Sequence, residues 1–222
     1  MAKWSKYPHD QKAITYAGDA LKKHWDALHK GDGEAFPKDT RLQEAWRQYH
    51  AGNFAEAAEL GEGSTAALKA TSIYATHIEK KEAARTKLFQ DAMAMATDLM
   101  KAEPKNANAF YQYGYSAGRY SQSISVMKAL KEGYGGKIKH ALETALKLDP
   151  KHADAHTALG AYQAEIIDKV GAMVGKLTYG ASKDAAVEHF EKALKLNPTS
   201  PIAHIEYANG AKINTSFITS LS

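Results

Sequence analysis

Lys101-Ala-Glu-Pro104-Lys-Asn-Ala-Asn-Ala-Phe110, followed by Tyr113-Gly114, is a phrase that returns twice more in this chain. The second copy is Lys147-Leu-Asp-Pro150-Lys-His-Ala-Asp-Ala-His156 with Leu159-Gly160, and the third is Lys195-Leu-Asn-Pro198-Thr-Ser-Pro-Ile-Ala-His204 with Tyr207-Ala208. The three prolines stand 46 and then 48 residues apart. A motif that returns at a period between about twenty and fifty residues is the signature of a repeat array. The sequence therefore predicts an all-α solenoid of antiparallel helix pairs.

The composition is that of an ordinary folded protein. Hydrophobic residues make up 44% and charged residues 24% of the 222 residues, which argues against wholesale disorder. The absence of cysteine excludes disulfides, thiolate metal sites and a cysteine nucleophile. The net charge of +4 comes from 29 basic and 25 acidic residues, so bulk charge predicts no nucleic-acid partner. No apolar run has the length of a signal peptide or a membrane span, so we expect no stable membrane insertion and a cytoplasmic protein, or one whose export signal has been removed.

The first third of the chain has its own helical pattern. Apolar residues recur at three- and four-residue steps from about His9 to His29, and Gly31-Asp-Gly33 ends that pattern. We expect residues 1–36 to form a helix and linker that pack on an array formed by residues 37–222, within a single domain overall. Further helices are expected at about 40–51, from Phe54 onward, at 64–80 and at 81–102.

Several of these residues carry a family resemblance. Trp46 and Tyr49, with Gly52-x-Phe54-x-x-Ala57, resemble the tetratricopeptide repeat, in which each unit packs two antiparallel helices. The later units match that family at Gly114, Ala145, Gly160 and Ala193. Small residues let helix backbones approach closely, so we expect these four positions to be buried where helices cross.

The later units depart from the family in length. A tetratricopeptide unit has about 34 residues, and the surplus falls at residues 120–136 and 165–182. Apolar residues keep helical spacing there, so the first helix of each unit is expected to run on by about three turns and to end in a glycine turn. Such units, over roughly residues 37–210, look like the divergent tetratricopeptide domains of the microtubule-dynamics regulator family and of helical lipoproteins that accompany some tripartite transporters.

Two constellations could carry chemistry but have simpler interpretations. Gly133-Tyr-Gly-Gly-Lys137 lacks the remaining residues of a phosphate loop and is interpreted as a turn between helices. His152 and His156 have the spacing of a zinc-binding pair, but no third ligand is placed by sequence, so packing or surface histidines are the default interpretation. No nucleophile elbow, metalloprotease helix or marked carboxylate pair is found. We expect no enzyme activity, no metal and no cofactor.

The remaining candidate is a surface. In a stack of helix pairs the first helices line the concave side, and its open face is expected to carry Trp46, Tyr49, His50, Tyr111, Tyr115, Arg119 and Glu165. Aromatic residues and arginine are enriched at interface centres, although Trp46, Tyr111 and Tyr115 could instead be packed core. The leading hypothesis is a scaffold for a peptide or partner protein. The alternative is a carrier of a small apolar ligand or lipid in a cavity between the extended helices, which Gly171-x-x-x-Gly175 would let pack together.

The array is expected to be incomplete at its C-terminal end. Residues 201–212 repeat the opening helix of a unit, and the Ser/Thr-rich stretch 213–222 is too short for a second helix. Ile202, Ile205, Tyr207 and Ile213 would then lack their usual cover. A homodimer through this helix is one expectation, and a truncated or foreign tail is the other.

Overall fold

The protein is built from helices. The computed structural model describes residues 4–8 and 15–219, with side chains up to residue 212, and all regular structure among these residues is helical. In chain order the helices are α1 (Ala20–Leu28), α2 (Thr40–His50), α3 (Phe54–Leu60), α4 (Thr65–His77), α5 (Glu82–Ala102), α6 (Ala107–Gln122), α7 (Val126–Lys131), α8 (Tyr134–Leu148), α9 (Ala153–Val170), α10 (Ala172–Val174), the π-helical turn η1 (Gly175–Tyr179), α11 (Lys183–Leu196) and α12 (Pro201–Thr219).

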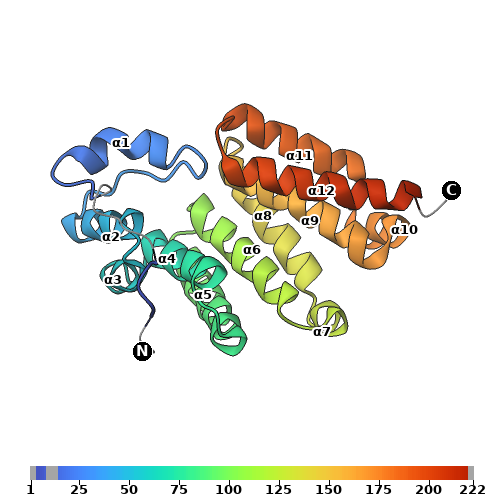
Figure 1. Ribbon diagram of the computed structural model, residues 1–222, viewed down its shortest axis with the longest axis horizontal. Helices are drawn as coiled ribbons and strands as arrows, with labels where there is room; N and C mark the ends of the chain where they lie inside the picture. Colours follow the sequence, from blue (N-terminus) through green and yellow to red (C-terminus); the bar gives the residue numbers. More distant parts are fainter. Residues whose placement is uncertain (1–3, 9–14, 220–222) are drawn as a thin grey trace.

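These helices pack as antiparallel pairs in sequence order. The pairs are α2 with α3, α4 with α5, α6 with α8, and α9 with α11, and α12 packs against α9 and α11 (Figure 1). Each first helix also contacts the first helix of the next pair, so α4, α6, α9 and α12 form one continuous layer. The predicted all-α solenoid, with a single helix at its C-terminal end, is confirmed.

The repeated phrase forms the turn that starts each new pair. The residue two places after each proline caps the next helix, because its side chain accepts a hydrogen bond from a backbone N–H in the first turn. Asn106 Oδ1 accepts from Ala109 N at 3.2 Å, and His152 Nδ1 accepts from Ala155 N at 3.1 Å. Ser200 Oγ accepts from Ala203 N at 3.3 Å. The motif therefore encodes a helix start as well as a period.

Small residues stand where the helices cross, as predicted. A Cβ on Gly114 would meet Leu142 Cδ2 at 2.8 Å, and one on Gly160 would meet the Phe190 ring at 3.0 Å. Ala145 and Ala193 are fully buried. These contacts fix the spacing of α6 against α8 and of α9 against α11.

The prediction of overlong first helices was wrong. Helix α6 ends at Gln122, and Ser125 then caps the separate helix α7 by accepting from Lys128 N at 3.2 Å. Helix α9 ends at Val170 because Gly171 adopts φ 82°, a conformation that favours glycine and interrupts the helix before α10 and η1. The surplus residues therefore form two short inserts, 123–133 and 171–180. The predicted glycine turns are present, since Gly133 and Gly180 also have positive φ.

The ends of the chain differ from the predicted pattern. Helix α1 begins at Ala20 instead of near His9, since Tyr16 and Gly18 have positive φ, and residues 9–14 lie outside the described part. Helix α12 continues to Thr219 instead of ending near residue 212. Leu21 and Trp25 of α1 are buried against α2. The division into residues 1–36 and 37–222 stays a prediction. Over residues 4–8 and 15–219, no helix is both long and apolar enough to cross a membrane.

Candidate functional site

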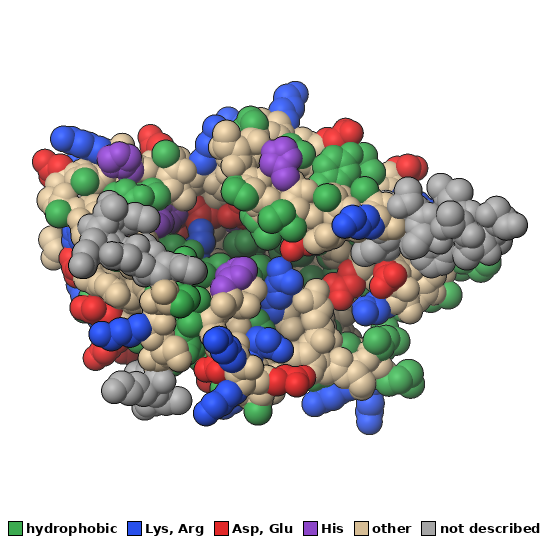
Figure 2. All heavy atoms as spheres, in the orientation of Figure 1, with side chains coloured by type: hydrophobic (Ala, Val, Ile, Leu, Met, Phe, Trp, Pro, Cys, Tyr) green, Lys and Arg blue, Asp and Glu red, His purple; other side chains and the backbone are tan. Residues whose placement is uncertain are grey.

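The layer of first helices encloses one side of a groove. Its volume is about 390 Å³, and its walls come from α4, α6, α9 and α12. Figure 2 shows this face of the molecule hollowed, with hydrophobic, acidic and basic side chains visible inside the hollow. We call this feature the concave groove, and its lining includes Lys69, Ile73, Tyr111, Tyr115, Arg119, Leu142, Asp154, Ala161, Glu165, Ile202, Ile205 and Glu206.

The middle of the concave groove is aromatic and aliphatic. Tyr111 is buried and lies against Tyr115, with ring centroids 6.2 Å apart. The Tyr115 hydroxyl is held by Thr76 Oγ1 at 2.9 Å, so its ring keeps one orientation. On the opposite wall, Ile202 and Ile205 of α12 are 42% and 55% exposed. The groove therefore offers apolar surface between two fixed walls.

One end of the groove carries an ion pair. Arg119 Nη2 lies 3.3 Å from Glu206 Oε1 and joins α6 to α12. The Arg119 guanidinium also lies 5.4 Å from the centre of the Tyr115 ring, a cation–π distance. Beside them, Gln122 Nε2 donates to Glu165 Oε2 at 2.9 Å. These contacts preorganise the charged end of the groove.

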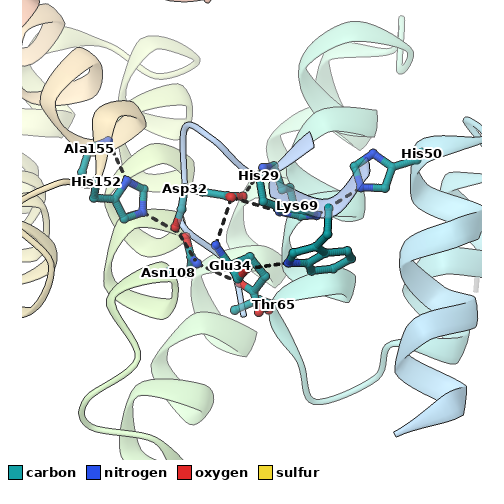
Figure 3. Close-up of polar contacts among 10 residues, drawn as sticks. His29, Asp32, Glu34, His50, Thr65, Lys69, Asn108, His152 and Ala155 are labelled. Atoms are coloured by element: carbon teal, nitrogen blue, oxygen red, sulfur yellow. Dashed lines mark hydrogen bonds and ion pairs between the residues drawn. The ribbon is translucent and has the colours of Figure 1, made fainter. Parts of the chain in front are cut away.

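The other end rests on a buried polar cluster (Figure 3). Lys69 Nζ of α4 is paired with Asp32 Oδ2, and His29 Nδ1 lies 3.0 Å from Asp32 Oδ1. Burial alone would raise the pKa of Asp32, but Lys69 and His29 hold it well below its usual range. Burial alone would likewise lower the pKa of Lys69, but Asp32 raises it. Both charges are therefore retained in the interior as a matched pair.

The same loop binds two further helices. Asn108 Nδ2 of α6 donates to Asp32 O at 3.0 Å and to Glu34 Oε2 at 2.7 Å, while Thr65 Oγ1 donates to Glu34 Oε1 at 2.9 Å. His152 Nε2 lies 2.9 Å from Asn108 Oδ1. Burial raises the pKa of Glu34 to about 7 and lowers that of His152 to about 4. Loop 29–34 thus ties α4, α6 and the start of α9 together.

Asp154 connects this cluster to the concave groove. Its backbone N donates to Gly31 O at 2.9 Å, and a Cβ on Gly31 would stand 2.2 Å from Asp154 Oδ1. A side chain at position 31 would displace the Asp154 carboxylate, so glycine allows this close approach. Asp154 also lines the groove, and burial raises its pKa to about 6. Lys69 lowers that pKa, so one lysine serves two carboxylates, Asp32 and Asp154.

The structure separates the predicted site residues into three groups. Tyr111, Tyr115, Arg119 and Glu165 all line the concave groove. Tyr49 and His50 lie elsewhere, at a separate recess with Tyr7 and Phe54. Trp46 is 2% exposed and packs edge-on against Trp25, so it belongs to the core and offers no surface to a ligand. Trp25 belongs to α1, and the repeat pattern alone does not reveal that this helix covers Trp46.

The two histidines with zinc-pair spacing have other partners. His152 is bonded to Asn108, and His156 Nδ1 lies 2.9 Å from His189 Nδ1. In the described part of the chain, no group of three or more His, Cys, Asp or Glu side chains could hold a metal ion. Sequence reasoning missed the cluster of Asp32, Lys69 and Asn108. The signal that could have found it is Lys69, a lone charge within Thr65–His77, a helix that is otherwise mostly buried.

Comparison with protein families identifies the chain. The family model described as regulator of microtubule dynamics protein 1-3 matches residues 64–207, more than half of the chain. The chain belongs to this family. No curated protein matches it.

The part that matches the regulator of microtubule dynamics family contains most of the site. It includes α4 to α11 and the part of α12 that lines the concave groove. Loop 29–34, which supplies Asp32 and Glu34, lies before the matched residues. The resemblance to the microtubule-dynamics regulators is thus confirmed. The groove lies between the first helices of neighbouring pairs. It does not lie at the place between extended helices where the alternative hypothesis expected a cavity.

Proposed function

We propose that this protein is a non-catalytic scaffold that binds a peptide segment of a partner protein in the concave groove. The observation that carries the proposal is the arrangement of the groove: apolar walls from α6 and α12 between two preorganised charged ends. Interface centres are built from apolar and aromatic residues with a few fixed polar groups.

The charges of the groove indicate the chemistry of the partner. Lys69 and Arg119 are its cations. Lys69 is paired with Asp32, and Arg119 is paired with Glu206. Asp154 and Glu165 add negative charge to the same walls. We therefore expect a peptide segment whose apolar residues flank at least one lysine or arginine, because a basic side chain complements the excess of negative charge in the groove.

A groove-filling variant tests the proposal. Ala161→Trp places an indole inside the concave groove, since Ala161 is a partly exposed groove residue on α9. Peptides selected from a random library on the wild-type chain should bind this variant about tenfold more weakly or worse, about 1.4 kcal/mol. The matched control is Ala94→Trp, on the exposed side of α5, which should bind like the wild type. Equal affinities of Ala161→Trp and wild type would place the peptide elsewhere and refute the proposal.

The family name suggests where to look for a natural partner. It refers to microtubule dynamics, so proteins of the microtubule system are the first candidates. We expect the wild-type chain to sediment with polymerised tubulin or with a protein bound to it, and the Ala161→Trp variant to lose this behaviour. Sedimentation that is unchanged by Ala161→Trp would mean that another surface makes the contact.

A second candidate is a carrier of a small apolar ligand. The observation in its favour is the volume of about 390 Å³, within the range of small-molecule sites, together with the aliphatic floor at Ile138 and Leu142. Native mass spectrometry of protein isolated from cells separates the two candidates. A retained apolar molecule that Ala161→Trp excludes would favour the carrier over the scaffold.

A further inference from the structure

The two inserts expose apolar side chains that the fold does not use. Met127 of α7 is 77% exposed, Met173 of α10 is 76% exposed and Leu177 of η1 is 80% exposed. Val126, Leu130 and Val174 are also exposed, and the fully described helices α7 and α10 have no buried residue. We call these six residues the tip surface. Large apolar side chains that are exposed on short segments of a fold are candidates for an interaction site.

The two inserts belong to one end of the molecule. Lys139 Nζ of α8, the helix that follows α7, donates to Tyr179 O of η1 at 2.7 Å. A Cβ on Gly135 of the same helix would meet the Tyr179 ring at 2.6 Å. Helices α7 and α10 accordingly lie at the end of the molecule away from α1 and α2 (Figure 1). Figure 2 shows hydrophobic side chains beside Lys or Arg side chains where α7 lies.

The charges around the tip surface are mainly positive. The two inserts, residues 123–133 and 171–180, contain Lys128, Lys131 and Lys176 against Glu132, and the last turn of α9 adds Lys169 and Asp168. All four lysines are exposed. Lys137, at the start of α8, is an additional exposed cation next to α7. A local excess of lysine around apolar side chains complements a surface that carries negative charge on its outside and is apolar underneath.

The form of the tip surface favours a bilayer over a peptide. Peptide segments bind in grooves that cover them on two sides, whereas Met127, Met173 and Leu177 project into solvent from short helices. A bilayer interface accepts projecting apolar side chains while lysines remain at the level of the headgroups. We propose that the tip surface docks the protein reversibly on membranes that contain anionic lipids. None of the six residues lines the concave groove, so docking leaves the groove free for its own ligand.

Vesicle cosedimentation of the full chain tests this proposal. The probes are vesicles of phosphatidylcholine alone and vesicles with about one third phosphatidylserine, which carry a strongly negative surface potential. The wild type should bind the anionic vesicles, and added salt should weaken the binding because it screens the lysines. Replacing Met127, Met173 and Leu177 together by glutamine should lower the partition coefficient about tenfold or more, since three apolar side chains no longer enter the interface.

The charge contribution is tested separately. Lys131→Gln and Lys176→Gln should each lower binding to anionic vesicles about fivefold, the effect of removing one lysine near such a surface. The matched controls are Leu148→Gln, a partly exposed apolar residue away from the tip, with Lys87→Gln and Lys101→Gln on α5. These three changes should leave vesicle binding unchanged.

The proposal would be overturned by either of two kinds of result. One is a wild-type chain that stays in the supernatant with both vesicle compositions, or a triple glutamine variant that binds as well as the wild type. The other is a wild-type dimer in light scattering that the triple glutamine variant converts to a monomer, without vesicle binding by either protein. In that case a second copy of the chain covers the tip surface.

Discussion

Single buried charges decide much of the stability of this protein. Lys69 has a side chain 15% exposed and Asp32 one that is 1% exposed, so neither has much contact with solvent. Lys69→Met would leave the Asp32 carboxylate buried without its cation. We expect the free energy of unfolding to fall by about 3–5 kcal/mol, measured by urea denaturation.

Two further variants identify the cause of that loss. The double variant Lys69→Met, Asp32→Asn removes both charges and should recover part of the stability. Lys87→Met breaks the exposed pair with Asp91 and should change stability by about 1 kcal/mol or less. If Lys69→Met were no more harmful than Lys87→Met, the pair would not be buried as described.

Glu34 makes stability depend on pH in an unusual direction. Burial raises its pKa from 4.5 to about 7, so the folded protein binds its proton more tightly than the unfolded chain does. The stability contributed by that proton is complete below about pH 4.5 and is lost as pH rises through 7. The loss amounts to about 3 kcal/mol for a shift of this size.

The variant Glu34→Gln isolates this effect from that of the histidines. Glutamine cannot ionise, so the variant should gain stability relative to the wild type between pH 5 and pH 8, measured by urea denaturation at both values. The half-buried His50 and the buried His152 have pKa values lowered by desolvation, and they cost stability below about pH 6.5 in both proteins. A stability difference that does not change between the two pH values would contradict a raised pKa for Glu34.

At the scale of elements, the crossing of α9 and α11 leaves no room for a larger side chain at Gly160. A Cβ on Gly160 would meet the Phe190 ring at 3.0 Å and Ala186 O at 3.1 Å. Gly160→Leu should therefore destabilise the protein by about 1–3 kcal/mol through overpacking. Thermal unfolding followed by circular dichroism measures the effect.

The control for this element is another helical glycine. A Cβ on Gly136 of α8 would meet no atom within 4 Å, so Gly136→Leu should raise stability by up to about 1 kcal/mol through helix propensity alone. Equal melting temperatures for Gly160→Leu and wild type would mean that α9 and α11 are not in this register.

At the scale of the whole molecule, α12 has two roles to reconcile. Its Ile202 and Ile205 are exposed, as expected of an uncovered edge, and they also form a wall of the concave groove. Tyr207 is not free either, because it stacks on Phe190 with ring centroids 5.1 Å apart. The side chain of Ile213 lies outside the described residues. Dimerisation through this helix stays a prediction, and such a dimer would cover the groove.

Light scattering tests the dimer. If the C-terminal helix pairs with a second copy, the variant Ile202→Lys, Ile205→Lys should be a monomer where the wild type is a dimer, because charged side chains replace the apolar contact. Peptides that fill the groove should likewise convert a wild-type dimer to a monomer. Monomers in both cases would show that α12 serves the groove alone.

What the sequence by itself determined was the repeat architecture. The positions of the helix pairs, the prolines and capping residues between them, and the small residues at Gly114 and Gly160 all follow from local rules. Caps and turns are set by a few neighbouring residues, and helix crossings by the recurrence of small ones. Helical spacing also assigned Tyr111, Tyr115, Arg119 and Glu165 to the concave face, and these residues line the groove, whereas Trp46, Tyr49 and His50, assigned by the same spacing, do not.

The tertiary structure alone decided the rest. Asp32, Lys69, Asn108 and Asp154 are far apart in the sequence, and they meet because loop 29–34 crosses the ends of α4, α6 and α9. The inserts kept helical spacing, but the positive φ of Gly171 and the cap at Ser125 broke them into short exposed helices. Periodicity reports which residues could share a face. Whether that face is buried depends on which distant segment packs against it.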